Sequence, residues 1–411
     1  LDQSTRFDHD AAGRLSTVAD PAGNVTRSTH DGLGRLATMT DPAGNVTRYQ
    51  YGDADDGLEG LLAAVIYPTY RIEYRYDVRD RPVQTIQMLD ADTRRITRVS
   101  HDGKGQVVST TDPAGHTTLR EYDGLGRMIR NIDALGGITR HQYDPRDNLV
   151  ALTDANTQTH RFEYDLAGRK TQETRPLGGT TQYTYDTLGR LITRTDASGA
   201  VRRYEYDAAN RKTEETYALG SAAPTQTIQY DYDDAGRLTG YQQSGDTVSR
   251  ATYTLDALGR PTEETLTYGT GASAITHTLG HGYTADGQRQ ALEYPDGKAV
   301  RFAYENGQLQ TASLPDGPTI RWTAYKNTQP TQIVFPGVVR QIDYDPLQRP
   351  IQLHAQALGT GTADAPTGAV LLDWQYTYDA TGNITQKDTQ DGRYAYAYDA
   401  PARSEPTTAD V

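Results

Sequence analysis

Tyr122-Asp123-Gly124-Leu125-Gly126-Arg127 is the stretch of sequence that decides the fold, because it recurs along the chain with few changes. Tyr185-Asp186-Thr187-Leu188-Gly189-Arg190 is a second copy. The aspartate of the motif returns every 21 residues at Asp102, Asp123, Asp144, Asp165, Asp186 and Asp207. A second aspartate series, at Asp112, Asp133 and Asp154, divides this period into steps of 10 and 11 residues. The chain is therefore a repeat protein whose unit contains two turns.

The first turn of each unit has the pattern D-x-x-G-R. An Asp at the start of a turn accepts hydrogen bonds from backbone N–H groups, and a Gly three residues later adopts the positive φ of a bulged hairpin. Asn210 takes the glycine position in one copy, and Asn tolerates positive φ well. We therefore predict a structural turn role for the residues of this pattern. They are Asp31, Gly34, Arg35, Asp123, Gly126, Arg127, Asp165, Gly168, Arg169, Asp186, Gly189, Arg190, Asp233, Gly236, Arg237, Asp256, Gly259 and Arg260.

The second turn of each unit reads D-P-A-G at residues 20–23, 41–44 and 112–115. Asp at the first position, Pro at the second and Gly at the fourth are the preferences of a type I turn. Later units keep shorter forms, such as Pro295-Asp296-Gly297. Each predicted strand thus lies between a first turn and a second turn.

The segments between turns are five or six residues long and rich in Thr, Tyr, Val, Arg and Ile, which favours β-strands. In Thr181-Gln182-Tyr183-Thr184-Tyr185, the two tyrosines share one face of a strand because side chains alternate. A chain of this length holds at most about 39 such strands. We predict an all-β fold in which tandem hairpins form one long antiparallel sheet.

The domain organisation follows from the continuity of the repeat. We expect residues 1–411 to form a single array, with irregular insertions near residues 52–68, 218–227 and 358–372. Repeat letters are already present at Phe7 and continue to Asp399, so we expect a fragment of a longer array. Two units also have the length of one β-propeller blade, but odd and even units show no alternation from Asp102 to Asp207.

Composition excludes several classes of protein. The chain contains no Cys and has a net charge of −13, which removes disulfides and thiolate metal sites and disfavours general nucleic-acid binding. No apolar run is long enough for a membrane span. The first residues have neither the basic nor the apolar region of a signal peptide.

Three patterns resemble ligand sites, and the repeat explains each better. Asp53, Asp55 and Asp56 precede Gly57 as in a calcium loop, but no Glu follows at the twelfth position. His277 and His281 have the spacing of a helical metal pair, but their context predicts a strand. The glycines of residues 32–35 and 103–106 coincide with first turns rather than with phosphate loops. We predict no catalytic residue, cofactor or metal site, and we interpret His101, His116 and His141 as solvated surface.

The strings Tyr185–Leu191 and Tyr122–Arg127 resemble the signature of the Rhs/YD-repeat family, and related strings cover nearly the whole chain. The resemblance implies that the sheet spirals into a hollow shell, or cocoon. In bacterial Rhs proteins and in the C component of insecticidal toxin complexes, such a shell encloses a C-terminal toxin domain. Rhs cores usually end in a D-P-x-G-L element linked to self-cleavage. Here Asn24, Asn45 and His116 follow the D-P-A-G turns, so we assign these turns no protease role.

The resemblance implies a function by enclosure rather than catalysis. The chain would be a shell segment of a bacterial Rhs-type polymorphic toxin, made in the bacterial cytoplasm and secreted or delivered to target cells, as in type VI secretion and interbacterial competition. Its main partner would be the C-terminal toxin domain of the same polypeptide, with secretion-apparatus proteins or a chaperone as further partners. Related arrays in teneurins support cell adhesion. The alternative is a cell-surface adhesin or carbohydrate-binding protein, which the rows of tyrosine suggest because exposed rings can stack on sugars.

Overall fold

One continuous antiparallel sheet forms the protein in the computed structural model, which describes residues 4–53, 58–219, 223–245, 247–398 and 404–407. Each of the 36 strands in these ranges pairs with the strand before it and the strand after it, except that β1 and β36 have one partner each. Strands follow one another in this way because short turns join them, and the two-residue alternation then sets one register for the whole sheet. The predicted all-β hairpin array is confirmed, and the propeller alternative is excluded.

The strands of the first half are β1 (Arg6–His9), β2 (Leu15–Ala19), β3 (Val25–His30), β4 (Leu36–Thr40), β5 (Val46–Tyr51), β6 (Leu62–Ile66), β7 (Arg71–Tyr76), β8 (Pro82–Met88), β9 (Arg94–His101), β10 (Val107–Thr111), β11 (Thr117–Tyr122), β12 (Met128–Ile132), β13 (Ile138–Tyr143), β14 (Leu149–Thr153), β15 (Thr159–Tyr164), β16 (Lys170–Thr174), β17 (Thr180–Tyr185) and β18 (Leu191–Thr195).

The strands of the second half are β19 (Ala200–Tyr206), β20 (Lys212–Leu219), β21 (Gln226–Tyr232), β22 (Leu238–Gly245), β23 (Ser249–Leu255), β24 (Pro261–Tyr268), β25 (Ile275–Tyr283), β26 (Arg289–Glu293), β27 (Ala299–Glu305), β28 (Gln308–Ser313), β29 (Thr319–Lys326), β30 (Gln329–Phe335), β31 (Val338–Tyr344), β32 (Pro350–Ala357), β33 (Val370–Tyr378), β34 (Ile384–Thr389), β35 (Gly392–Tyr398) and β36 (Ser404–Thr407). The described residues contain one helical segment, the short 3-10 turn η1 (Gly271–Ser273).

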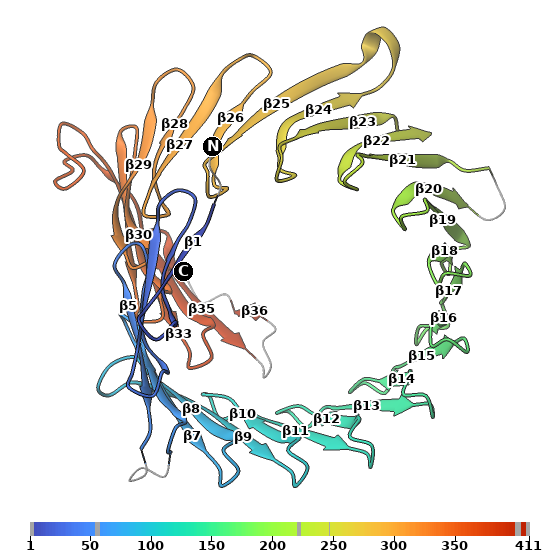
Figure 1. Ribbon diagram of the computed structural model, residues 1–411, viewed down its shortest axis with the longest axis horizontal. Coiled ribbons are helices and arrows are strands. Elements are labelled where there is room, and N and C mark those ends of the chain that lie inside the picture. Colours follow the sequence, from blue (N-terminus) through green and yellow to red (C-terminus); the bar gives the residue numbers. More distant parts are fainter. Residues whose placement is uncertain (1–3, 54–57, 220–222, 246, 399–403, 408–411) are drawn as a thin grey trace.

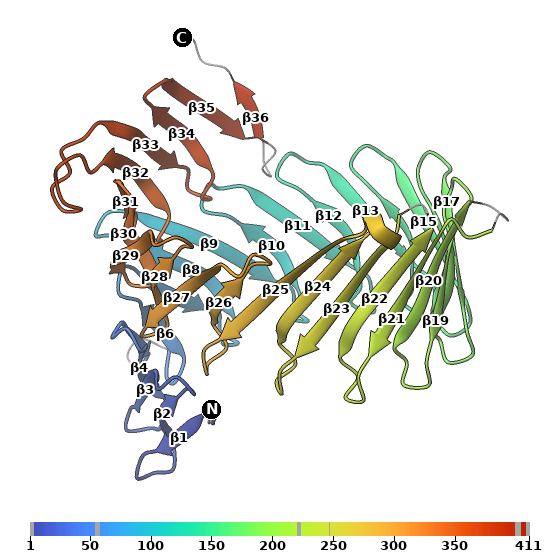
Figure 2. The same ribbon diagram turned by 90° about the horizontal axis from the view of Figure 1, so that it is seen from above.

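The sheet curls into a coil that passes one full turn (Figure 1), and the N-terminal strands lie beside β27 to β33 (Figure 2). So many strands do not stay flat, because each pair adds right-handed twist. Among the described residues, only consecutive strands are in contact. The opposite walls of the coil therefore do not pack on each other.

Where the coil overlaps itself, second turns of the early strands meet first turns of the late strands. A cleft of about 530 Å³ is lined on one side by Asp20, Asp41 and Pro42 and on the other by Asn306 and Thr328. Nearby, the Nε of Arg95 in β9 donates a 2.7 Å hydrogen bond to the carbonyl oxygen of Ala380, in the turn after β33. We call this line of contact the seam.

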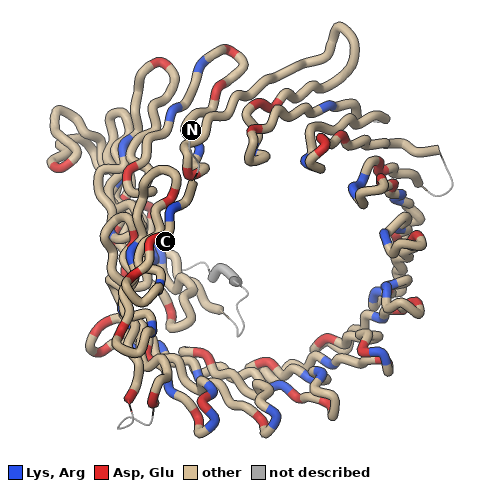
Figure 3. Tube along the Cα trace, viewed as in Figure 1, with Lys and Arg blue, Asp and Glu red and all other residues tan. Residues whose placement is uncertain are grey.

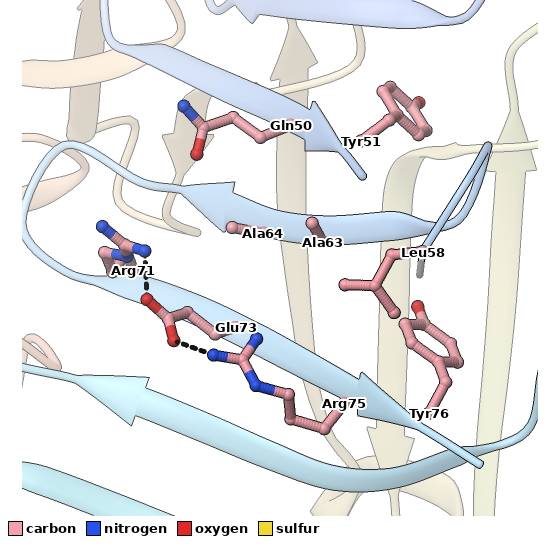
Figure 4. A pocket seen from close by; sticks show the side chains of 9 residues that line it. All are labelled: Gln50, Tyr51, Leu58, Ala63, Ala64, Arg71, Glu73, Arg75 and Tyr76. Atoms are coloured by element: carbon pink, nitrogen blue, oxygen red, sulfur yellow. Dashed lines mark hydrogen bonds and ion pairs between the residues drawn. The ribbon is translucent and has the colours of Figure 1, made fainter. Parts of the chain in front are cut away.

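The two faces of the wall differ in position and composition. Figure 4 shows Gln50, Arg71, Glu73 and Arg75 on the near side of the sheet, with other strands of the coil behind it. These side chains point away from the space that the coil surrounds, so they mark its outer face. Residues that are paired directly across neighbouring strands point to the same side of the sheet, so the pairing assigns further residues to the outer face. They are Arg98, Arg140, Arg161, Gln182 and Arg203.

The inner face is rich in aromatic rings. It is formed by the residues that alternate along each strand with those of the outer face. Tyr49, Tyr74, Phe162, Tyr183 and Tyr204 belong to it. No second layer covers these rings within the described chain, so few side chains are fully buried, and half of the buried apolar residues are alanines, such as Ala151 and Ala218 of the outer face. Figure 3 shows acidic and basic positions interspersed around the coil. The fold is therefore held by its ladders and turns more than by a thick core.

The irregular regions keep strands of their own. β6 lies inside the first region, residues 52–68, and β20 runs to Leu219 at the start of the second, residues 218–227. In the third, residues 358–372, the loop between β32 and β33 is closed by backbone hydrogen bonds such as Thr367 N–H to the carbonyl oxygen of Leu358. Longer connections thus interrupt the spacing of the repeat while the sheet continues.

Candidate functional site: the hairpin turns

Both turns of the repeat have the same hydrogen-bond geometry. In the first turn, Oδ1 of Asp123 accepts from the N–H groups of Leu125 and Arg127, and Oδ2 accepts from Nε of Arg127. In the second turn, Oδ1 of Asp20 accepts from the N–H groups of Ala22 and Asn24, and Oδ2 accepts from Nδ2 of Asn24. One carboxylate thus accepts two backbone N–H groups and one side-chain donor of a five-residue turn, while the N–H groups of Asp123 and Gly126 bind backbone carbonyl oxygens.

Positive φ occurs at the fourth position of these turns. The glycines of the predicted first turns have φ between 77° and 89°; they are Gly34, Gly126, Gly168, Gly189, Gly236 and Gly259. Asn210 takes the same conformation, with φ of 64°. Thr157 does so as well, at φ of 64° in a second turn, although β-branched residues adopt this region at a cost.

The arginine that ends each first turn reaches forward to the next repeat. Nε of Arg169 binds Oδ2 of Asp165 in its own turn, while Nη1 donates to the carbonyl oxygen of Asp186, 17 residues later. The guanidinium also lies over the ring of Tyr185, at 4.9 Å from its centroid. Planar guanidinium groups make such combined contacts more readily than Lys does. The same stacking joins Arg35 to Tyr51, Arg127 to Tyr143, Arg190 to Tyr206, Arg211 to Tyr232, Arg260 to Tyr283 and Arg349 to Tyr378.

The tyrosine of the repeat reaches backward. The phenol of Tyr164, at the end of β15, donates to the carbonyl oxygen of Leu149, at the start of β14. This bond closes the open end of the hairpin formed by β14 and β15. The same pattern is made by Tyr51, Tyr76, Tyr122, Tyr143, Tyr185, Tyr206, Tyr232, Tyr283, Tyr304, Tyr325, Tyr344, Tyr378 and Tyr398. The sequence shows that tyrosine precedes aspartate but does not show this bond.

The turn carboxylates are held in their ionised form. A side-chain hydrogen bond from Arg14 is the largest cause that lowers the pKa of Asp10 from 3.8 to about 2. Arg81 acts in the same way on Asp77, whose pKa is also lowered to about 2. The direction follows from hydrogen bonding and positive charge, which both favour the carboxylate.

Two histidines that were expected at the solvated surface are partly buried, so that prediction was wrong for them. The Nδ1 atoms of His101 and His141 are inaccessible and have no hydrogen-bond partner among the described residues. Burial lowers the pKa of His141. Strand alternation places both rings on the inner face, which the turn pattern of the sequence does not reveal. His116 is exposed and contacts Asp112 at 3.0 Å.

The other patterns considered as ligand sites lie as follows. His277 and His281 are both in β25, where four residues of extended chain separate them by about 13 Å. The glycines at 32–35 and 103–106 lie in first turns. Asp55, Asp56 and Gly57 fall outside the described residues. Within the described ranges, no group of three or more His, Asp or Glu side chains is placed to hold a metal ion.

A cleft of about 780 Å³ on the outer face is lined by Gln50, Arg71, Glu73 and Arg75 (Figure 4). Both arginines form ion pairs with Glu73. The carboxylate therefore offsets part of the positive charge of the cleft. No helix in the described part of the chain has the length and hydropathy of a membrane span.

Comparison with known proteins identifies the family of the repeat. The RHS Repeat family matches the chain six times, at residues 9–46, 30–69, 101–138, 143–180, 164–200 and 185–222. The units in these ranges are therefore RHS repeats, and the expected relationship to the Rhs/YD-repeat family is confirmed. A comparison with curated proteins gave no match.

Solved structures share the fold over almost the whole chain. The crystal structure of TcdB2-TccC3-Cdc42 has a TM-score of 0.65 and 18% identity, covering 96% of this chain and 24% of that one. The crystal structure of TcdB2-TccC3 has a TM-score of 0.60 and 16% identity, covering 96% and 29%. A structure of the Photorhabdus luminescens Tc holotoxin pore has a TM-score of 0.63 and 18% identity, covering 96% and 23%. The chain thus spans about a quarter of the length of these proteins and shares their fold over that part.

Proposed function

We propose that this chain is a wall segment of an Rhs-type toxin shell that isolates a C-terminal toxin domain of the same polypeptide until delivery to a target cell. The observation that carries the proposal is the coil itself, whose wall overlaps at the seam and whose opposite sides do not pack together among the described residues. Residues 1–411 act as one array within a longer shell. They work by enclosure and not by catalysis.

The inner face suits a polypeptide cargo. Its tyrosine and phenylalanine rings offer contact area that does not depend on one partner sequence. Two of its lysines are paired with glutamates: Nζ of Lys170 lies 2.8 Å from Glu173 and 5.0 Å from the centroid of the Tyr183 ring. Lys212 and Glu215 repeat this arrangement at 2.7 Å. An inner wall with paired charges and many rings can hold a chain without strong electrostatic preference.

The route of delivery belongs to the proposal as well. The protein would be made in the bacterial cytoplasm and exported with the help of secretion-apparatus proteins or a chaperone. Type VI secretion in interbacterial competition is the route that the Rhs relationship favours. Expression of the complete protein in a strain that lacks this apparatus should leave the toxin effect on neighbouring cells absent, while full export in that strain would exclude the route.

The adhesin or carbohydrate alternative has less support. It relies on rows of exposed tyrosine rings, but strand alternation places the rings of Tyr183 and Tyr204 on the inner face. The hydroxyl groups of the repeat tyrosines are also used by backbone carbonyl groups, as in Tyr185 and Lys170. Tyr268, which is 52% exposed, belongs to the same inner row, because cross-strand pairs lead from Tyr204 through Ser249 to Tyr268.

Protease protection tests the enclosure. A specific protease site is placed in the polypeptide that follows the array in the complete protein, and the same site is placed between Thr362 and Ala365, in the outer loop between β32 and β33. Enclosure predicts cleavage in the loop and protection of the cargo. Equal cleavage at both positions would contradict enclosure.

A further inference from the structure

One edge of the coil carries a row of exposed apolar side chains at first turns. These residues are 61% to 101% exposed, and they are Leu33, Val78, Leu125, Leu166, Leu188 and Leu258. We call this edge, from the turn at Asp31 to the turn at Arg260, the leading rim. Figure 2 shows part of it as the lower ends of the hairpins β19–β20, β21–β22 and β23–β24. Exposed apolar rows of this kind usually mark an interaction surface.

The opposite edge of the coil carries exposed leucines at second turns. Leu135 is 68% exposed in the turn after β12, and Leu177 is 97% exposed in the turn after β16. Asp112-Pro113-Ala114-Gly115 forms the neighbouring second turn. We call this edge, from Asp112 to Gly179, the trailing rim.

The structure already contains one contact between these two kinds of edge. At the seam, the second turns at Asp20 and Asp41 face the first-turn side of β27 to β30 across a shared cleft. Arg95, beside another second turn, binds Ala380 in a first turn. The leading rim is the direct continuation of the first-turn edge that the seam covers. The trailing rim is likewise the continuation of its second-turn edge.

We propose that a second copy of the 411-residue chain binds the leading rim with its own trailing rim, in the place that a further winding of the longer shell would take, so that copies stack head to tail along the coil axis; this contact rests on the proposed function. The contact extends the seam geometry from within one chain to between two chains. Because the two rims are different surfaces, the contact is heterologous and leaves one free rim at each end of an assembly. Association therefore continues beyond a dimer as concentration rises.

Charge sets the salt dependence of this contact. The chain has a net charge of −13, so two copies repel each other at low ionic strength. The turn carboxylates are already occupied within their own turns, as Asp186 is by Leu188 and Arg190. Leucine contacts supply the attraction, and salt screens the repulsion. Head-to-tail association should accordingly strengthen with salt.

Three variants of the 411-residue chain test the proposal by sedimentation velocity over a range of protein and salt concentrations. The leading-rim variant carries Leu166→Lys and Leu188→Lys, and the trailing-rim variant carries Leu135→Lys and Leu177→Lys. The control adds the same charge to the outer face through Leu119→Lys and Gln182→Lys. All these positions are exposed, so circular dichroism should report the same sheet signal in each variant.

The expected results separate a head-to-tail contact from other kinds of association. The unmodified chain and the control form a concentration-dependent series of assemblies that grows with salt, and each rim variant alone stays monomeric. An equimolar mixture of the two rim variants forms a dimer and nothing larger, because each partner keeps the rim that the other has lost. A monomeric unmodified chain, association of either rim variant alone, or a monomeric mixture would overturn the proposal.

Discussion

The phenol oxygen of Tyr164 lies 2.9 Å from the carbonyl oxygen of Leu149, to which it donates a hydrogen bond. This one contact explains why tyrosine recurs before the turn aspartate, because its ring extends to the neighbouring strand and its hydroxyl satisfies a backbone carbonyl there. Phenylalanine has the same ring but lacks the donor. Histidine, which occupies this place at His30 and His101, is too short to supply the same bond.

Tyr164→Phe should therefore loosen one hairpin without changing the sheet. Loss of this hydrogen bond is expected to cost about 0.5 to 1.5 kcal/mol. The effect should appear as faster hydrogen exchange in β14 and β15, with distant strands unchanged, since repeat arrays respond locally. Tyr268→Phe removes a hydroxyl from an exposed ring and is the control. Equal exchange in both variants would show that the bond does not stabilise the hairpin.

Gly189→Val should strain the first turn between β17 and β18. Gly189 has φ of 86°, and its Cβ position has only the ordinary neighbour Arg169 at 3.7 Å, so the cost arises from the backbone. We expect a loss of about 1 to 3 kcal/mol. Gly189→Asn is the matched variant, since Asn210 adopts the same conformation in the next repeat. Denaturant unfolding should give the highest free energy of unfolding for the unmodified chain, a lower value for the Gly189→Asn variant and the lowest value for the Gly189→Val variant. A Gly189→Val variant as stable as the Gly189→Asn variant would contradict the assigned turn.

Acid should unfold the array in a defined pH range. The pKa of Asp10 and of Asp77 is lowered to about 2, against about 3.9 in an unfolded chain. A lowered pKa adds stability above the unfolded value, and this stability is lost as pH falls through the folded value. The sheet signal in circular dichroism should hold down to about pH 4 and decline between about pH 4 and pH 2. A midpoint near pH 6 would instead assign the transition to the histidines.

Arg95→Ala should open the seam. The side chain of Arg95 joins residues that are 285 positions apart through Ala380, and burial together with the nearby Arg349 lowers its pKa. Hydrogen bonds from charged donors contribute about 1.5 to 3 kcal/mol, so exchange in the turn from Asp379 to Asn383 should rise by about tenfold or more. Arg94→Ala, at an exposed neighbouring position, is the control. Unchanged exchange in the Arg95 variant would remove this residue from the closure of the coil.

Local chemistry made much of the fold predictable. The letters D-x-x-G-R and D-P-A-G define turns through side-chain acceptors and positive φ, and these effects act over five residues. The antiparallel sheet then follows, because short turns can join only neighbouring strands. The predicted sheet and its shell-like curl were confirmed by the strand pairing and by the likeness to TcdB2-TccC3.

Long-range geometry made the rest unpredictable. The alternation of side chains along a strand places Tyr183 and Gln182 on opposite sides of the sheet. It does not show which of these two residues points into the coil. The burial of His141 follows from that choice and was missed for the same reason. The seam joins Arg95 to Ala380, and no pattern within either segment specifies the other. The backward bond of Tyr164 was also missed, although the 15-residue interval between Tyr164 and Leu149 recurs in the regular repeats, as in Tyr143 and Met128, and is visible in the sequence.

The most direct test of enclosure compares two consecutive residues of β19 that lie on opposite faces. Arg202 belongs to the inner row with Tyr183 and Tyr217, Arg203 belongs to the outer row with Thr184, and both are exposed. The described array has no cysteine, so Arg202→Cys and Arg203→Cys each introduce one thiol, and a bulky polyethylene glycol maleimide reports access to it in the complete protein. A closed shell predicts rapid modification at position 203 and protection at position 202, with protection lost in the isolated 411-residue chain. Equal modification of both thiols in the complete protein would contradict a closed shell.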